Sequence, residues 1–167
     1  ESFVNLIGAI MALIMLTISA KPADKEHEYG HTKAEYFSSA IEGALIVLAA
    51  LSIIRSAVPR IIEPTPLENL NAGLLFSLGA SLINLVVALI LIENGKKRNS
   101  IVLEADGKHL LTDVWTSAGV IVGILIVKLT GIYILDPIIA ILVAINIIYT
   151  GYQLISRSAS GLMDASI

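Results

Sequence analysis

Cysteine is absent from the 167-residue chain, and charged residues make up only 15% of it. Without cysteine the chain can form neither disulfide bonds nor thiolate metal sites, so any metal ligand must be a histidine, a carboxylate, an amide or a backbone oxygen. Aromatic residues are also few, at 5%, and no basic, aromatic-interleaved patch indicates nucleic-acid binding. The chain shows no nucleophile–base pair, phosphate loop or cofactor fingerprint that would indicate an enzyme.

Apolar residues are in excess, at 56% of the chain, and the mean hydropathy is +0.83. They gather in blocks, predicted as spans at residues 1–20, 34–62, 70–93, 103–128 and 136–156. These blocks approach or exceed the ~20 residues that cross a bilayer, whereas a signal peptide would supply a single block. The sequence therefore predicts an all-α membrane protein, a polytopic transmembrane helix bundle, with one transmembrane domain over residues 1–167. The uncharged core of the second block, residues 43–54, is short, so a span must also include Glu42, which would then face a cavity or a polar neighbour, or Arg55, whose side chain can extend to the interface.

Basic residues of the predicted loops fall on one side of the predicted bundle. They are Lys21, Lys25 and Lys33 after the first block, Lys96, Lys97 and Arg98 after the third, and Arg157 after the fifth. Residues 93–100, ENGKKRNS, are predicted to form a short basic turn. Only Arg60 and Lys128 lie near the loops of the other side. Because Lys-rich and Arg-rich loops stay in the cytoplasm, we predict that the first set is cytoplasmic.

Two ionisable residues, His109 and Asp113, stand four apart at the start of the fourth block, within EADGKHLLTDV at residues 104–114. On a helix they share one face, and facing lipid they would be costly, so such a pair usually lines a cavity and marks an ion pathway. The pair predicts a transition-metal site; the alternative is a helix start in the headgroup region with a hydrated Asp113. Glu1 and Asn5 have the same spacing in the first block, where Asn5 could instead form an interhelical hydrogen bond.

The loop KPADKEHEYGHTK, at residues 21–33, carries the other two histidines, His27 and His31, together with Asp24. One carboxylate and two imidazoles suit Zn²⁺ and neighbouring divalent ions. The alternative is a hydrated loop in which the histidines titrate and bind nothing.

The same loop contains HEYGH, which matches the HExxH helix signature of zinc proteases, with His27 and His31 as ligands and Glu28 as general base. Gly30 inside the motif, Pro22 upstream and the polar surroundings disfavour the helix that this chemistry needs. An intramembrane zinc metalloprotease is therefore the alternative function, and a membrane scaffold in which the histidines bind nothing is a third.

Two segments resemble the cation diffusion facilitators. Residues 22–36, PADKEHEYGHTKAEY, are similar to the loop after that family's second helix, and residues 105–114, ADGKHLLTDV, are similar to the HxxxD segment of its fifth helix. The resemblance covers essentially the whole chain. It implies that the five blocks are helices two to six of a six-helix fold, with the first helix and a cytoplasmic C-terminal domain outside this sequence.

The resemblance also implies three sets of site residues. The transport site would comprise Glu1, Asn5, His109 and Asp113, and its last two residues would also exchange protons. A second site, in the cytoplasmic loop, would comprise Asp24, His27 and His31. Lys33 and Asp164 would form an ion pair, the charge interlock, near a dimer contact. At the helix-two positions many family members have two aspartates, or a histidine and an aspartate. Asn5 departs from that pattern and removes one anion from the site.

By this resemblance the chain is a divalent transition-metal exporter working by alternating-access metal/proton antiport. Its partners would be membrane lipid, metal ions, protons and a second copy in a homodimer, with no nucleic acid. Zn²⁺ is the first candidate, and the uncharged Asn5 leaves iron, manganese, cobalt and cadmium open. The implied location is a bacterial inner (cell) membrane, with the His-rich loop in the cytoplasm. Ligand chemistry agrees, since metal binds neutral imidazole and ionised carboxylate, for which protons compete.

Overall fold

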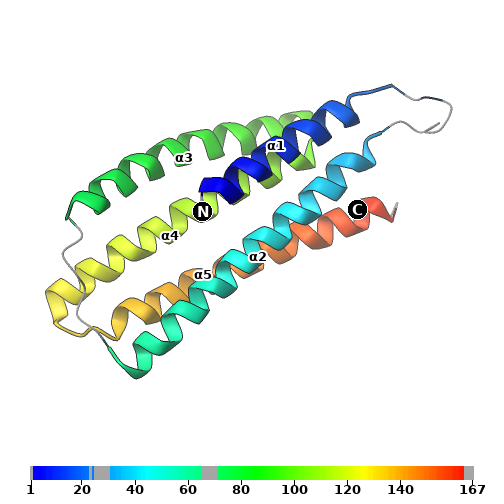
Figure 1. The fold of residues 1–167 in the computed structure, drawn as a ribbon. Coiled ribbons are helices and arrows are strands. Elements are labelled where there is room, and N and C mark those ends of the chain that lie inside the picture. The colour runs from blue at the N-terminus through cyan, green and yellow to red at the C-terminus, as the bar shows by residue number, and fades with distance from the viewer. Residues whose placement is uncertain (1, 23, 25–30, 65–70, 164–167) are drawn as a thin grey trace.

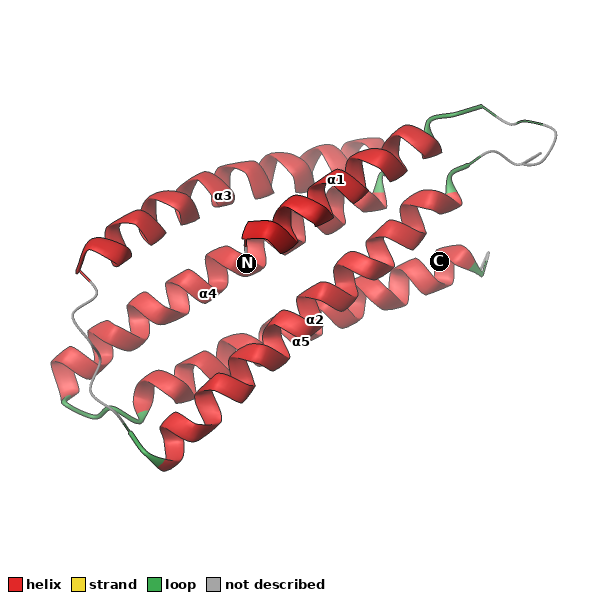
Figure 2. Ribbon diagram, viewed as in Figure 1, coloured by secondary structure: helices red, strands yellow, loops and turns green. Residues whose placement is uncertain are grey.

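The computed structural model describes residues 2–22, 24, 31–64 and 71–163 of the chain. These residues form five α-helices: α1 (Ser2–Ser19), α2 (Lys33–Ile62), α3 (Asn71–Arg98), α4 (Ile101–Thr130) and α5 (Leu135–Leu162). The helices run up and down in one elongated bundle (Figure 1), and the described part of the chain contains no strand (Figure 2). The prediction of an all-α, polytopic helix bundle is confirmed.

Four helices are long and apolar enough to cross a membrane: α2, α4, α5 and the part of α3 from Phe76 to Arg98. In α1, the described apolar part, Gly8–Ser19, is shorter. Large apolar side chains stay exposed on the outside of the bundle, including Leu82, Ile83 and Leu89 of α3. Apolar side chains on the outside and charged side chains inside are the arrangement that lipid demands.

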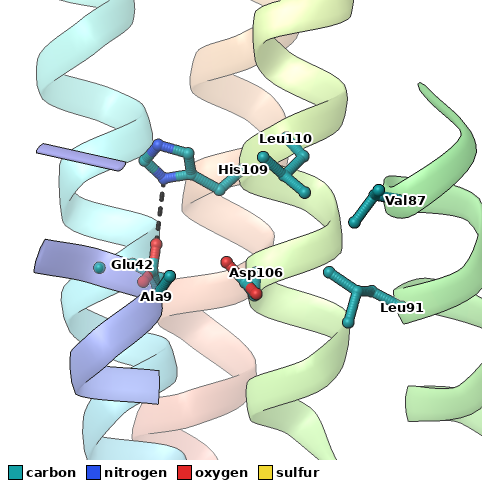
Figure 3. Close-up of a pocket in the computed structure, with 8 residues that line it drawn as sticks. Ala9, Glu42, Val87, Leu91, Asp106, His109 and Leu110 are labelled. Atoms are coloured by element: carbon teal, nitrogen blue, oxygen red, sulfur yellow. Dashed lines mark ion pairs between the residues drawn. The ribbon is translucent and has the colours of Figure 1, made fainter. Parts of the chain in front are cut away.

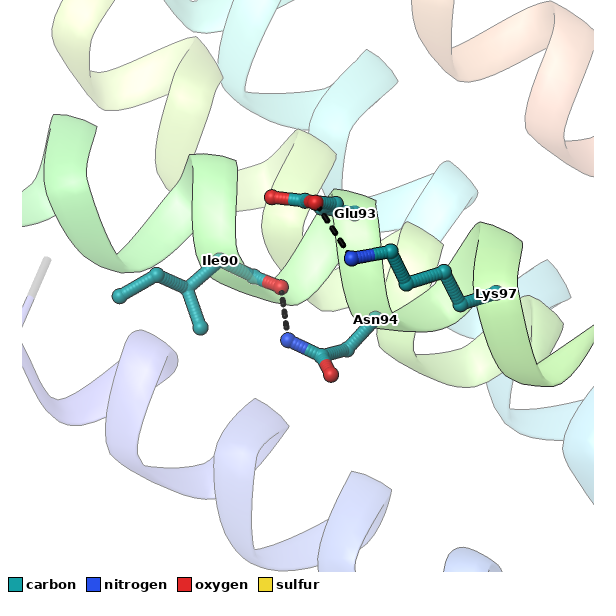
Figure 4. Close-up of polar contacts among 4 residues, drawn as sticks. All are labelled: Ile90, Glu93, Asn94 and Lys97. Carbon is teal, nitrogen blue, oxygen red and sulfur yellow. Dashed lines mark hydrogen bonds and ion pairs between the residues drawn. The ribbon is translucent and has the colours of Figure 1, made fainter.

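The basic segment after the third block is helical rather than a turn. α3 continues to Arg98, and on its exposed face Lys97 Nζ lies 2.6 Å from Glu93 Oε1, while Asn94 Nδ2 donates to the Ile90 carbonyl at 2.8 Å (Figure 4). Such i,i+4 contacts support a helix where the apolar pattern has ended. The reversal into α4 comes at Asn99, which has a positive φ of 52°. Asparagine tolerates this left-handed conformation better than most residues.

Packing divides the bundle into two close pairs, α2 with α5 and α3 with α4. α4 also contacts α2 and α5, α1 contacts α2 and α4, and within the described part of the chain α3 contacts α4 alone. The central buried cluster lies where α2, α4 and α5 meet, and it comprises Ile46, Ala50, Ile101, Ala105, Ala144, Ile147 and Leu154. Small residues let helices approach closely in lipid. α4 is therefore the helix that touches all the others.

One end of the bundle, here called the basic end, is where α1, α3 and α5 finish and α2 and α4 begin (Figure 1). It carries Lys21, Lys33, Lys96, Lys97, Arg98 and Arg157. At this end Glu35 of α2 accepts two hydrogen bonds, from Ser19 Oγ at 2.9 Å and from Ser100 Oγ at 2.5 Å. Ser19 ends α1 and Ser100 precedes α4, so a single carboxylate joins three helices.

Replacing Glu35 with alanine is expected to loosen this end of the bundle. Both hydroxyls lose a charged acceptor, and hydrogen bonds to charged groups contribute about 1.5–3 kcal/mol each, so the free energy of unfolding should fall by at least that amount. Unfolding in detergent micelles measures it. The matched control is Glu93→Ala, which removes an exposed i,i+4 ion pair and should change nothing measurable. Equal stability of the two variants would contradict the prediction.

Candidate functional site

A cavity of about 200 Å³ lies between four helices in the half of the bundle nearer the basic end. It is lined by Gly8 and Ala9 of α1, Glu42 of α2, Val87 and Leu91 of α3, and Asp106, His109 and Leu110 of α4. The lining is apolar except for two carboxylates and one imidazole (Figure 3). The space exceeds that of one water molecule, so the cavity can hold a small ion with part of its hydration.

The polar groups of the cavity come from α2 and α4. Glu42 Oε2 lies 3.0 Å from His109 Nδ1, and the two side chains are only 1% and 11% exposed. Asp106 precedes His109 by three residues, which places both on one face of α4, directed toward the cavity (Figure 3). Two acids and an imidazole inside a spanning bundle are costly to bury and mark an ion pathway.

Glycines allow the neighbouring helices to approach this cluster. A Cβ on Gly8 would lie 2.9 Å from Glu42 Oε1, so a larger residue there would displace the carboxylate. A Cβ on Gly107 would lie 2.9 Å from the Ala88 carbonyl, the point at which α3 rests on α4. The absence of these side chains is what lets α1 and α3 close the cavity over Glu42 and His109.

Three of the predicted transport residues, Asn5, His109 and Asp113, belong to α1 and α4, two helices that are in contact. His109 is buried, and Asp113 is half-buried one turn further from the basic end. Asn5 belongs to α1 and precedes the cavity-lining Ala9 by four residues. At 1.5 Å per residue, Asn5 and Asp113 each lie about 6 Å beyond the cavity level along their helices. The Asn5 side chain and all of Glu1 lie outside the described residues, so the four-residue set stays a prediction.

Of the predicted loop site, the structure describes one pair. His31 Nε2 lies 3.5 Å from Asp24 Oδ2, while His27 and the Glu28 of the HExxH motif lie outside the described residues. Within the described ranges, no group of three or more histidines and acids has the arrangement of a metal site. The loop triad therefore also stays a prediction.

Of the predicted interlock, Lys33 is described and Asp164 is not. Lys33 Nζ donates to the Leu162 carbonyl at 3.3 Å, so the start of α2 lies against the end of α5, two residues before Asp164. Lys33 therefore lies near the chain position of its predicted partner, and the ion pair between them stays a prediction.

Sequence reasoning left two cavity residues without a role. Glu42 was expected to face a cavity or a polar neighbour, and the structure supplies both, but its partner His109 could not be named. Asp106 was assigned to no site, although its i−3 spacing from His109 was a usable signal. Two further pairs between helices, Arg60 with Asp136 and Arg157 with Glu104, hold α2 to α5 and α5 to α4.

Comparisons with known proteins agree with this architecture. The chain is 49% identical over 167 residues to the uncharacterized transporter sll1263 of Synechocystis sp., covering all of this chain and 54% of that protein. It is 29% identical over 167 residues to the cation-efflux pump FieF of Shewanella oneidensis, covering all of this chain and 56% of the pump. It is 29% identical over 160 residues to the cadmium, cobalt and zinc/H(+)-K(+) antiporter of Bacillus subtilis, covering 96% of this chain and 51% of the antiporter.

The chain thus spans about half the length of these relatives. All three are named as transporters, which confirms the expectation that the chain is not an enzyme and leaves the HExxH protease without support. The sequence model of the cation efflux transmembrane domain matches residues 1–163. This match confirms the resemblance seen in the loop and HxxxD segments, and the chain belongs to the cation efflux family.

Proposed function

We propose that this chain is the transmembrane part of a divalent transition-metal exporter that exchanges metal ions for protons by alternating access. Family membership supports cation efflux. The observation that carries the finer proposal is the burial of His109 beside the cavity between the helices, because an imidazole shielded from lipid, with Asp113 on the same face of α4, is a suitable ligand for a dehydrated transition metal.

The donor atoms favour transition metals over magnesium or calcium. Mg²⁺ and Ca²⁺ prefer sites made of oxygen alone, whereas a site that includes imidazole nitrogen suits zinc and its neighbours. Zn²⁺ is the first candidate, and iron, manganese, cobalt and cadmium are the others. The Bacillus subtilis relative is named for cadmium, cobalt and zinc, which supports this choice.

Proton competition supplies the coupling. A cation binds neutral imidazole and ionised carboxylates, so its arrival releases protons and its departure is favoured when they return. The proposed transport site consists of Glu1, Asn5, His109 and Asp113. A site that opens alternately to each face of the membrane would then exchange metal ions for protons.

The proposed orientation follows from the charge distribution, and the proposed assembly from the family to which the chain belongs. The basic end would face the cytoplasm of a bacterial cell, where Asp24, His27 and His31 would collect the cation. Two copies would form a homodimer, with Lys33 and Asp164 as an interlock near the contact.

The test is ion flux in proteoliposomes that contain a pH-sensitive dye. Imposing a Zn²⁺ gradient is expected to drive protons in the opposite direction, in proportion to the zinc moved, because both compete for the same groups. A Mg²⁺ gradient and protein-free vesicles are the controls and should move no protons. Zinc movement without proton movement would contradict antiport, and an absence of zinc movement would contradict the exporter.

A further inference from the structure

Glu42 is a buried carboxylate that the proposed transport site does not use. It lies within the spanning helix α2 and is 1% exposed. Its Oε2 lies 3.0 Å from His109 Nδ1, while its Oε1 is directed toward Gly8, where a Cβ would lie 2.9 Å from it. Burying such a group is costly unless it is paired, so the contact with His109 is what makes its position tolerable.

We propose that Glu42 is a positioning residue for His109. In this proposal, Oε2 accepts the Nδ1–H of the imidazole, which fixes the tautomer and leaves the lone pair of Nε2 for the transported cation. Histidines that bind a metal through one nitrogen almost always donate the other N–H to a carboxylate, a carbonyl or water. The inference rests on the proposed function, in which His109 is a ligand.

The direction of the ring supports this assignment. Figure 3 shows one ring nitrogen turned to Glu42 and the other on the opposite side of the ring, away from both Glu42 and Asp106. Asp113 follows His109 by four residues, one turn further along the same face of α4. In the proposed site, a cation on Nε2 would be shared with Asp113, and Glu42 would hold the ring from its other nitrogen.

Glu42 would position the ring from a helix that carries none of the proposed transport ligands. The described ligands, Asn5, His109 and Asp113, belong to α1 and α4, whereas Glu42 is on α2, which packs most closely against α5. The orientation of His109 then depends on where α2 stands relative to α4. Glu42 would in this way link the affinity of the site to the packing of the bundle.

The experiment measures the tautomer of His109 and the affinity for Zn²⁺ in the same protein. Nitrogen-15 NMR of histidine-labelled, metal-free protein in lipid bilayers, at a pH where the ring is neutral, should show Nδ1–H for His109, assigned by comparison with His109→Gln. Glu42→Gln is expected to shift the ring toward the Nε2–H form and to weaken Zn²⁺ binding, measured by calorimetry, about 10–100-fold. The exposed Glu93→Gln is the matched control and should change neither.

Three outcomes would overturn the inference: an Nε2–H tautomer in the unaltered protein, unchanged affinity in Glu42→Gln, or lowered affinity with an unchanged tautomer. The first needs no variant, so the inference stays testable even if Glu42→Gln does not fold. Failure of the proposed function is separate, because it would appear as Zn²⁺ binding and flux that survive in His109→Gln.

Discussion

Replacing His109 with alanine is expected to abolish metal-driven proton flux. His109 supplies the imidazole of the proposed transport site and stands where α4 meets Glu42 of α2. Loss of an outer partner of a metal ligand already costs about 10–100-fold in affinity or activity, so loss of the ligand itself should exceed about 100-fold. The measurement is the initial rate of proton movement driven by a Zn²⁺ gradient in proteoliposomes.

A second variant distinguishes the loss of the metal ligand from a loss of folding. Alanine removes the contact partner of a buried carboxylate, so His109→Ala should also lower stability. His109→Gln keeps a donor for Glu42 while removing the imidazole, and it should fold better yet transport equally poorly. Gln153→Ala, at an exposed position on α5, is the control and should keep its rate. Near-normal flux in both His109 variants would remove this residue from the transport site.

Replacing Gly151 with alanine is expected to destabilise the bundle at the contact between α2 and α5. A Cβ at this position would lie 2.9 Å from the Gly43 carbonyl oxygen and 2.7 Å from Val47 Cγ2. The first of these atoms is backbone, so the helices themselves must separate. Overpacking of this kind costs about 1–3 kcal/mol. Thermal unfolding of the purified protein in detergent or lipid measures the loss.

The control is the same substitution at a glycine with free space around it. A Cβ on Gly79, in α3, would meet no atom within 4 Å. Gly79→Ala should therefore leave stability unchanged or raise it slightly, because alanine favours helix over glycine. If the two variants unfold at the same temperature, close approach at Gly43 and Gly151 does not hold α2 to α5.

Much of the fold could be predicted because lipid imposes a simple rule on the sequence. Every spanning segment must be apolar for about 20 residues, so the spans appear directly as apolar blocks. The end of α3 was predicted poorly for the same reason. Its last six residues, Glu93 to Arg98, are polar and lie beyond the apolar pattern, and i,i+4 contacts keep them helical.

The candidate site was predictable only within a single helix. His109 and Asp113 share a face of α4, and regular spacing shows this without a structure. The pairing of Glu42 with His109, or of Arg60 with Asp136, joins different helices and depends on how they pack. Such packing is set by small residues such as Gly8 and Gly107, whose neighbours the sequence alone does not name.

The two bonds that Glu35 accepts lie at the end of the bundle that water can reach. When the contacts with Ser19 and Ser100 open, water can hydrogen-bond to the hydroxyls and to the carboxylate in place of the lost partners. Separating α2 from α5 allows no such replacement by water, because it would leave the backbone around Gly43 and Gly151 facing hydrocarbon. We therefore expect the contacts of Glu35 with the end of α1 and the start of α4 to open before the contact between α2 and α5.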